Sequence, residues 1–178
     1  MVDSDFRFFP TQRDDVFGYV LHPVDLATNE AMAAACRREP RDIVDLVKIH
    51  HEILPLGAVI WAAVKECQGF TPEGVINDIR RFARYSASDF DRMGGDVPVD
   101  PGASTKDLRR ALDDAESFVM RMPTDKIGLL FLKYGKVVQP DPARLEEYTT
   151  HASAPRGHWP SSPEIGTAML ERYCKDST

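Results

Sequence analysis

The chain has few cysteines and no long hydrophobic run. Its 178 residues contain three cysteines, Cys36, Cys67 and Cys174, which are far apart and form no C-x-x-C pair. This spacing argues against a disulfide framework or a zinc site and is typical of reduced cysteines in a cytosolic protein. The longest apolar stretch, Ala58 to Val64, is far too short to cross a bilayer. We therefore expect a cytoplasmic protein that does not contact a membrane.

Several sequence signatures are also missing. The chain has no G-x-x-x-x-G-K-S/T phosphate loop, no H-E-x-x-H metal helix and no G-x-S-x-G nucleophile turn. The first ten residues are acidic and aromatic, without the basic region and apolar run of a targeting segment. The formal net charge of -6 argues against a general nucleic-acid coat, although it leaves room for a local basic patch.

The apolar residues that are present predict an α+β fold that is mostly helical. Asp5–Phe9 alternates like a strand, Thr11–Asp15 reads as a polar turn, and Phe17–Leu21 reads as a second extended piece. Because two isolated strands are marginally stable in water, we expect partner strands upstream of this segment. A β-hairpin is expected over Ile127–Val138. Helices are expected over Val24–Arg38, from Pro40 to Pro55, over Ala58–Cys67, from Thr71 to Ala83, from Ser104 to Met122 and over Pro163–Lys175.

Glycine and proline mark one internal boundary. Residues 93–103 contain a glycine pair, a third glycine and two prolines, which is typical of a loop or linker. They separate residues 1–92 from residues 104–178. Ser104 would then cap the next helix, with Asp107 in the capping-box position.

The most informative segment is Arg37–Leu46, at the junction of two expected helices. Arg41 and Asp45 are four residues apart and so share one helical face. A guanidinium cluster at a helix N-terminus can hold a triphosphate, because arginine offers forked donors and the helix end adds positive potential. The alternative is a solvated network of ion pairs. The candidate nucleotide-binding residues are Arg37, Arg38 and Arg41, and the candidate catalytic residues are Asp42 and Asp45.

A second basic patch lies further along the chain. Arg80, Arg81 and Arg84 precede Tyr85, and such a basic-aromatic patch can touch RNA phosphates and stack a base. The alternative is a plain solvated helix face. The adjacent pair His50-His51 could supply a metal ligand or a base, but neighbouring helical residues point about 100° apart, so both cannot face one metal. We expect a role at the surface or at the helix end, which histidine suits.

Several of these runs resemble one known family, the AbiEii/AbiGii toxin family of nucleotidyltransferases. The resemblance covers about residues 5 to 90. It is carried by Phe6–Pro10, Gly18–Asn29, Arg37–Leu46, Pro55–Gly57 with Trp61–Ala63, and Gly69–Pro72. The resemblance implies a polymerase-β-like enzyme that transfers nucleotides from an NTP to tRNA with magnesium, as the toxin of a toxin–antitoxin pair. It also implies short strands from a nucleotidyltransferase sheet followed by a helical bundle.

The resemblance assigns roles to individual residues. Asp42 matches the family's aspartate, Asp45 its companion and Arg41 the arginine of the R-D-x-x-D-L motif. Asp5, with Asp3 as the alternative, lies where a third, metal-binding carboxylate would fall, and Glu30 occupies the position of the family's lysine. Residues 1–92 would be the C-terminal part of the nucleotidyltransferase domain, whereas residues 104–178 match nothing known.

Two departures from the family pattern shape the expected function. The family's upstream glycine–serine motif, which supplies two metal ligands, is absent, and Glu30 reverses the charge that should meet a triphosphate. We therefore expect a truncated nucleotidyltransferase that is inactive alone and uses magnesium only with the missing segment. The main alternative is a non-catalytic helical module that binds an antitoxin or regulatory partner through the helices after Gly57. A small RNA-binding domain is the third possibility.

Overall fold

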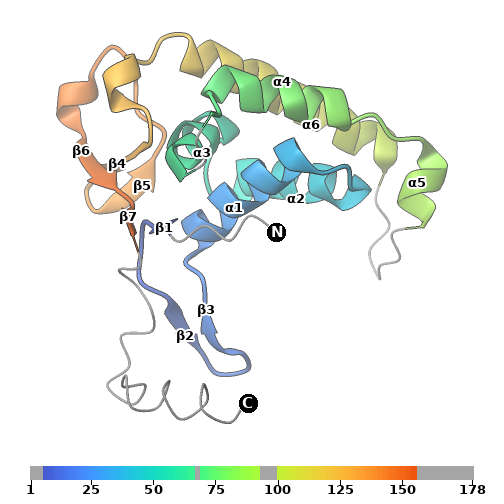
Figure 1. Ribbon diagram of the computed structural model, residues 1–178, viewed down its shortest axis with the longest axis horizontal. Helices are drawn as coiled ribbons and strands as arrows, with labels where there is room; N and C mark the ends of the chain where they lie inside the picture. The colour runs from blue at the N-terminus through green and yellow to red at the C-terminus, as the bar shows by residue number, and fades with distance from the viewer. Residues whose placement is uncertain (1–5, 67–68, 93–99, 156–178) are drawn as a thin grey trace.

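A computed structural model describes residues 6–66, 69–92 and 100–155 of the chain. Figure 1 shows a body of packed helices with a small sheet at one end and a two-stranded hairpin projecting away from it. The helices are α1 (Pro23–Cys36), α2 (Pro40–Glu52), α3 (Leu56–Ala63), α4 (Pro72–Phe82), α5 (Ala87–Asp91) and α6 (Pro101–Val119). The predicted α+β class, mostly helical with short N-terminal strands, is confirmed. In this part of the chain no helix has the length and apolar character needed to cross a bilayer.

Proline and polar caps set the helix starts. Proline occupies the first turn of α1, α2, α4 and α6, where its missing N–H costs no hydrogen bond. The Thr71 hydroxyl accepts from the Gly74 amide at 3.1 Å, as its sequence context predicts. Helix α6 starts earlier than expected, because Asp100 rather than Ser104 caps it and accepts from the Gly102 amide at 2.8 Å. Residues 101–103 of the predicted linker are therefore the first turn of α6.

Helix α3 is the centre of the core. All eight of its residues are buried, which agrees with the prediction of a central helix that is apolar on every side. Helix α1 approaches α3 and α4 through small residues such as Ala27 and Ala31, which are fully buried. Helix α6 lies C-terminal to the predicted boundary, yet it packs against α2, α3 and α4. Its apolar stripe therefore completes the same core.

Seven short strands form three small antiparallel sheets in the described residues. They are β1 (Phe6–Arg7), β2 (Gln12–Asp14), β3 (Gly18–Val20), β4 (Leu129–Lys133), β5 (Lys136–Val138), β6 (Thr149–Ala152) and β7 (Ala154–Pro155). The predicted hairpin appears as β4–β5, and β6 adds to the other edge of β4. Strand β1 pairs with β7, a downstream partner that no local sequence signal indicated. Strand β2, predicted as a polar turn, pairs with β3.

The buried carboxylate of Asp25 anchors the opening segment to α1. It accepts the backbone N–H of Phe8 at 2.6 Å and that of Phe9 at 3.0 Å. The Phe8 carbonyl lies 2.6 Å from His151 Nε2, and the Phe9 ring lies between the His22 and His151 rings at 4.2 and 4.8 Å. Burial raises the pKa of Asp25, against the opposing effect of the two amide hydrogen bonds. These contacts fix where β1 ends and where the hairpin β2–β3 projects.

Candidate functional site

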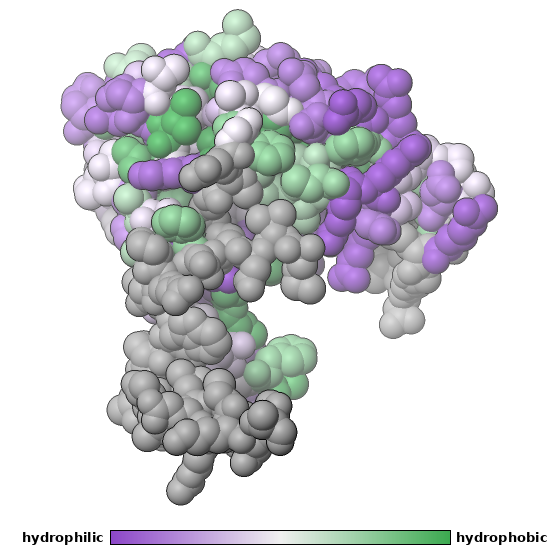
Figure 2. Space-filling view, in the orientation of Figure 1, coloured by the Kyte–Doolittle hydropathy of each residue, from purple (hydrophilic) through white to green (hydrophobic). Residues whose placement is uncertain are grey.

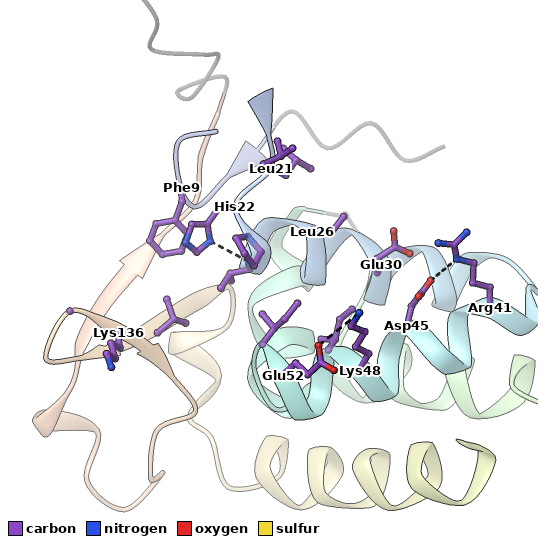
Figure 3. Close-up of a pocket in the computed structure, with 17 residues that line it drawn as sticks. Phe9, Leu21, His22, Leu26, Glu30, Arg41, Asp45, Lys48, Glu52 and Lys136 are labelled. Atoms are coloured by element: carbon purple, nitrogen blue, oxygen red, sulfur yellow. Dashed lines mark hydrogen bonds and ion pairs between the residues drawn. The ribbon is translucent and has the colours of Figure 1, made fainter. Parts of the chain in front are cut away.

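A groove of about 970 Å³ opens between the start of α1, the outer face of α2 and the β4–β5 turn. Figure 3 shows its charged side chains rising from α1 and α2 and from the hairpin at Lys136. Apolar side chains such as Phe9, Leu21 and Leu26 line the end near the opening strands. The groove therefore has an apolar end and a charged wall.

The charged wall consists of one row of side chains on α2. Arg41 Nε lies 3.2 Å from Asp45 Oδ2, which confirms that these two residues share a face. One turn further, Lys48 Nζ lies 3.9 Å from Glu52 Oε2. Both pairs are exposed, so each holds its cation weakly and either cation can turn toward an anion in the groove. Lys48 and Glu52 were not predicted as site residues, although their four-residue spacing is the same signal that Arg41 and Asp45 give.

Glu30 contributes a carboxylate from α1 to the same wall. Its Oε2 lies 3.5 Å from an Arg37 nitrogen, which lies 2.8 Å from Asp42 Oδ1. Burial raises the pKa of Glu30; Arg37 opposes this effect, while Asp45 and Asp42 add to it. Arg37 is thus held by two carboxylates, and the hydrogen bond to Asp42 raises the pKa of Arg37.

The three predicted nucleotide-binding arginines do not converge. Arg38 donates to the Arg84 carbonyl at 2.7 Å, and its guanidinium lies 5.5 Å from the centre of the Tyr85 ring. It therefore points toward the end of α4. Arg37 is held by Asp42, so only Arg41 of the three lines the groove. Of the two predicted catalytic aspartates, Asp45 lines the groove and Asp42 is buried against Arg37.

The carboxylates of the described residues do not fit a pair of magnesium ions. In that part of the chain, no group of three or more His, Cys, Asp or Glu side chains is arranged to hold a metal ion. Asp42 and Asp45 each bind an arginine, whereas two-metal transfer needs several clustered carboxylates facing the ions. Asp5, the predicted metal ligand, lies outside the described residues.

The three predicted RNA-binding arginines differ in whether they form ion pairs. Arg80 lies 2.6 Å from Asp113 and 2.8 Å from Glu116 on α6, so its charge is compensated. Arg81 pairs with Asp78 at 2.8 Å. Arg84 lines a separate cavity beside α6. The structure thus leaves one of the three arginines with no ion pair among the described residues.

The groove brings together side chains from two helices. Glu30 of α1 and Arg41 and Asp45 of α2 all line it beside the opening strands. Lys136 joins them from the β4–β5 turn, a placement that no local sequence pattern indicates. Comparison of the chain with models of protein families, with curated proteins and with solved structures finds no match.

Proposed function

We propose that this groove faces the phosphate groups of a nucleotide in an AbiEii-type nucleotidyltransferase, and that the chain does not transfer nucleotides by itself. The observation that carries the proposal is the meeting of Glu30, Arg41 and Asp45 in one groove beside the opening strands. These positions come from two helices, and the family resemblance matches them to residues around the substrate. If the groove lay on another face of the molecule, the R-D-x-x-D-L motif would not line a cavity.

The row on α2 gives the groove its capacity to bind anions. Arg41 and Lys48 are held only by exposed ion pairs with their i+4 neighbours. Such pairs contribute little free energy, so a phosphate can replace the carboxylate as partner at low cost. Arginine then offers two parallel donors and lysine a compact charge, which suits neighbouring phosphates of one chain.

The same wall explains why the chain is proposed to be inactive alone. Glu30 brings a negative charge to a position where the family pattern has a cation, and it repels a triphosphate in this half-buried setting. Asp42 and Asp45 are also paired with arginines. Magnesium-dependent chemistry would require further carboxylates positioned at the groove.

The test is incubation of the full chain with each α-labelled NTP, magnesium and tRNA. We expect no label on the RNA. Label transfer that disappears in Asp42→Ala and Asp45→Ala would refute the proposed inactivity and assign catalysis to these two aspartates. Melting curves of the variants would show that they remain folded.

A second function, binding of a protein partner, is favoured by a different observation. The β2–β3 turn carries Val16 and Phe17, which are 82% and 78% exposed, and β3 carries the partly exposed Tyr19. Figure 2 shows hydrophobic atoms on this projecting part of the molecule. This observation adds the hairpin as a candidate surface to the helices after Gly57, which the sequence predicted. Among the described residues, no third strand joins this sheet, so its edges can pair with a partner's strand.

This second function is tested by co-purification with the protein encoded by the neighbouring gene, a candidate antitoxin. Val16→Ser with Phe17→Ser should abolish binding. Met120→Ser is the matched control, because Met120 is also 75% exposed but lies at the end of α6. Equal binding by all three proteins would rule out the hairpin as the partner surface.

A further inference from the structure

Three cations that make no ion pair with any described residue lie where the end of α4 meets the start of α6. Arg84 follows α4, while Lys106 and Arg109 lie one turn apart on α6. Within the described residues, none of the three makes an ion pair, whereas Arg80 and Arg81 of α4 do. Figure 2 shows predominantly hydrophilic side chains over the α4, α5 and α6 end of the body.

These cations line two adjoining cavities. One, of about 300 Å³, is lined by Arg84 and Arg109. The other, of about 390 Å³, is lined by Lys106, Arg109 and the aromatic ring of Tyr85. Thr105 and Arg109 belong to both walls, so the two cavities adjoin and together make a recess lined by Arg84, Lys106 and Arg109. Arg80 also lines the first cavity, but its charge is compensated on α6.

The acidic groups around this recess are already engaged. Asp113 lines the first cavity, but it lies 2.6 Å from Arg80, which also pairs with Glu116. Asp100, at the start of α6, accepts the Gly102 and Ala103 amides as a helix cap. The charges of Arg84, Lys106 and Arg109 therefore have no dedicated counter-charge in the described part of the recess.

The recess is also held in place by a residue from another helix junction. Arg38 donates to the Arg84 carbonyl at 2.7 Å and lies over the Tyr85 ring. The Tyr85 and Phe90 rings pack edge to face, with their centroids 6.2 Å apart. Burial raises the pKa of Tyr85 to about 12, so its hydroxyl stays protonated and can donate a hydrogen bond. Arg38 acts here as a positioning residue and not as a nucleotide ligand.

We propose that Arg84, Lys106 and Arg109 form a binding recess for phosphate groups, with Tyr85 as its aromatic wall. Forked guanidinium donors and an ammonium on adjoining walls match the charge and the acceptor geometry of phosphate. The recess shares no residue with the groove of Figure 3, so the inference does not rest on the proposed function. The phosphates can belong to an RNA backbone or to a small organic phosphate.

Two titrations of the full chain distinguish these sources. Inorganic pyrophosphate, followed by calorimetry, reports binding of free phosphate groups. A fluorescein-labelled single-stranded uridine oligonucleotide, followed by anisotropy at several salt concentrations, reports binding of the RNA backbone. The variant is R84Q with R109Q, and the matched control is R110Q, because Arg110 is an exposed neighbour on α6 that lines neither cavity.

We expect the double variant to weaken binding of at least one probe by about tenfold or more, and R110Q by less than about twofold. For RNA, the salt slope should also fall by about 0.7 for each phosphate that the double variant no longer neutralises. Binding of pyrophosphate alone assigns a small phosphate ligand, and binding of RNA alone assigns its backbone. Absence of binding to both probes, or equal weakening in R110Q, would overturn the proposal. Circular dichroism melts check that each variant is folded.

Discussion

Asp42 and Asp45 belong to one motif but have different surroundings. Asp42 is buried and accepts from Arg37 at 2.8 Å, whereas Asp45 pairs with an Arg41 side chain that is 78% exposed. Asp42→Ala should therefore lower the free energy of unfolding by about 2 kcal/mol, because it removes buried hydrogen bonds between charged groups. Asp45→Ala should change it by less than about 0.5 kcal/mol. Urea denaturation measures both; a larger destabilisation by Asp45→Ala would contradict the assigned environments.

His22 links stability to pH. Its Nδ1 accepts the Val24 amide at 3.2 Å at the start of α1, which requires the neutral ring, and burial lowers the pKa of His22 against the attraction of Asp25. The unfolded chain therefore takes up the proton first as the pH falls. The stabilisation is complete above about pH 6.5 and is lost at lower pH.

The measurement is the melting temperature between about pH 7.5 and pH 5.5. Asn is a good helix cap that does not titrate in this range, so His22→Asn should keep the helix start and reduce the fall in melting temperature. An unchanged pH dependence in His22→Asn would show that other groups govern it.

At the scale of elements, the close approach of α3 and α6 depends on Gly57. A Cβ at this position would lie 2.8 Å from Phe118 Cδ1 and 2.9 Å from Gln139 Oε1. Gly57→Ala should therefore destabilise the chain by about 1–3 kcal/mol through overpacking, although alanine favours helix formation. Gly102→Ala, in the first turn of α6, is the comparison variant: its Cβ would lie 3.3 Å from the exposed Asp100 carboxylate, which can shift, so it should destabilise the chain less than Gly57→Ala. Chemical denaturation of both variants measures the change in the free energy of unfolding. A stabilising Gly57→Ala would contradict the close packing of α3 against α6.

The elements predicted well are those with local signals. Proline at the helix start located α2 and α4, a face of small apolar residues located α1, and the β4–β5 hairpin lies within the predicted range Ile127–Val138. Strand β6 was missed because its pairing with β4 depends on residues distant in the sequence, and Thr149–Ala152 has no strong alternation. The start of α6 was missed because Pro101 and Gly102 are typical of a linker, although Asp100 followed by proline is itself a helix start.

The candidate site was predicted only in part, because several of its contacts join residues that are distant in the sequence. The Arg41–Asp45 pair follows from helical spacing, and it lines the groove. The directions of Arg37 and Arg38 do not follow from spacing, because they depend on Asp42 and on the Arg84 carbonyl. Lys136 and the apolar end of the groove depend on how the β4–β5 sheet and the opening strands meet α1.

At the scale of the whole molecule, the chain combines a closed helical core with an open groove beside the opening strands. The core is completed by α6, and the groove lies where α1, α2 and the β4–β5 turn meet (Figures 1 and 3). The central claim is that this groove faces nucleotide phosphates and that the charge of Glu30 limits its affinity.

Calorimetric titration of ATP and GTP into the wild-type chain, Glu30→Lys and Glu73→Lys tests that claim directly. Glu73→Lys is the control, because Glu73 is an exposed residue of α4 that does not line the groove, so the variant makes the same change in net charge elsewhere. Since a charge reversal near a phosphate at partial burial is worth more than about 1.4 kcal/mol, Glu30→Lys should bind at least about tenfold more tightly than the wild type. Glu73→Lys should bind within about threefold of the wild type, because its charge is solvent-screened and distant from the groove. Equal affinity of all three proteins, or equal gains in both variants, would contradict the claim.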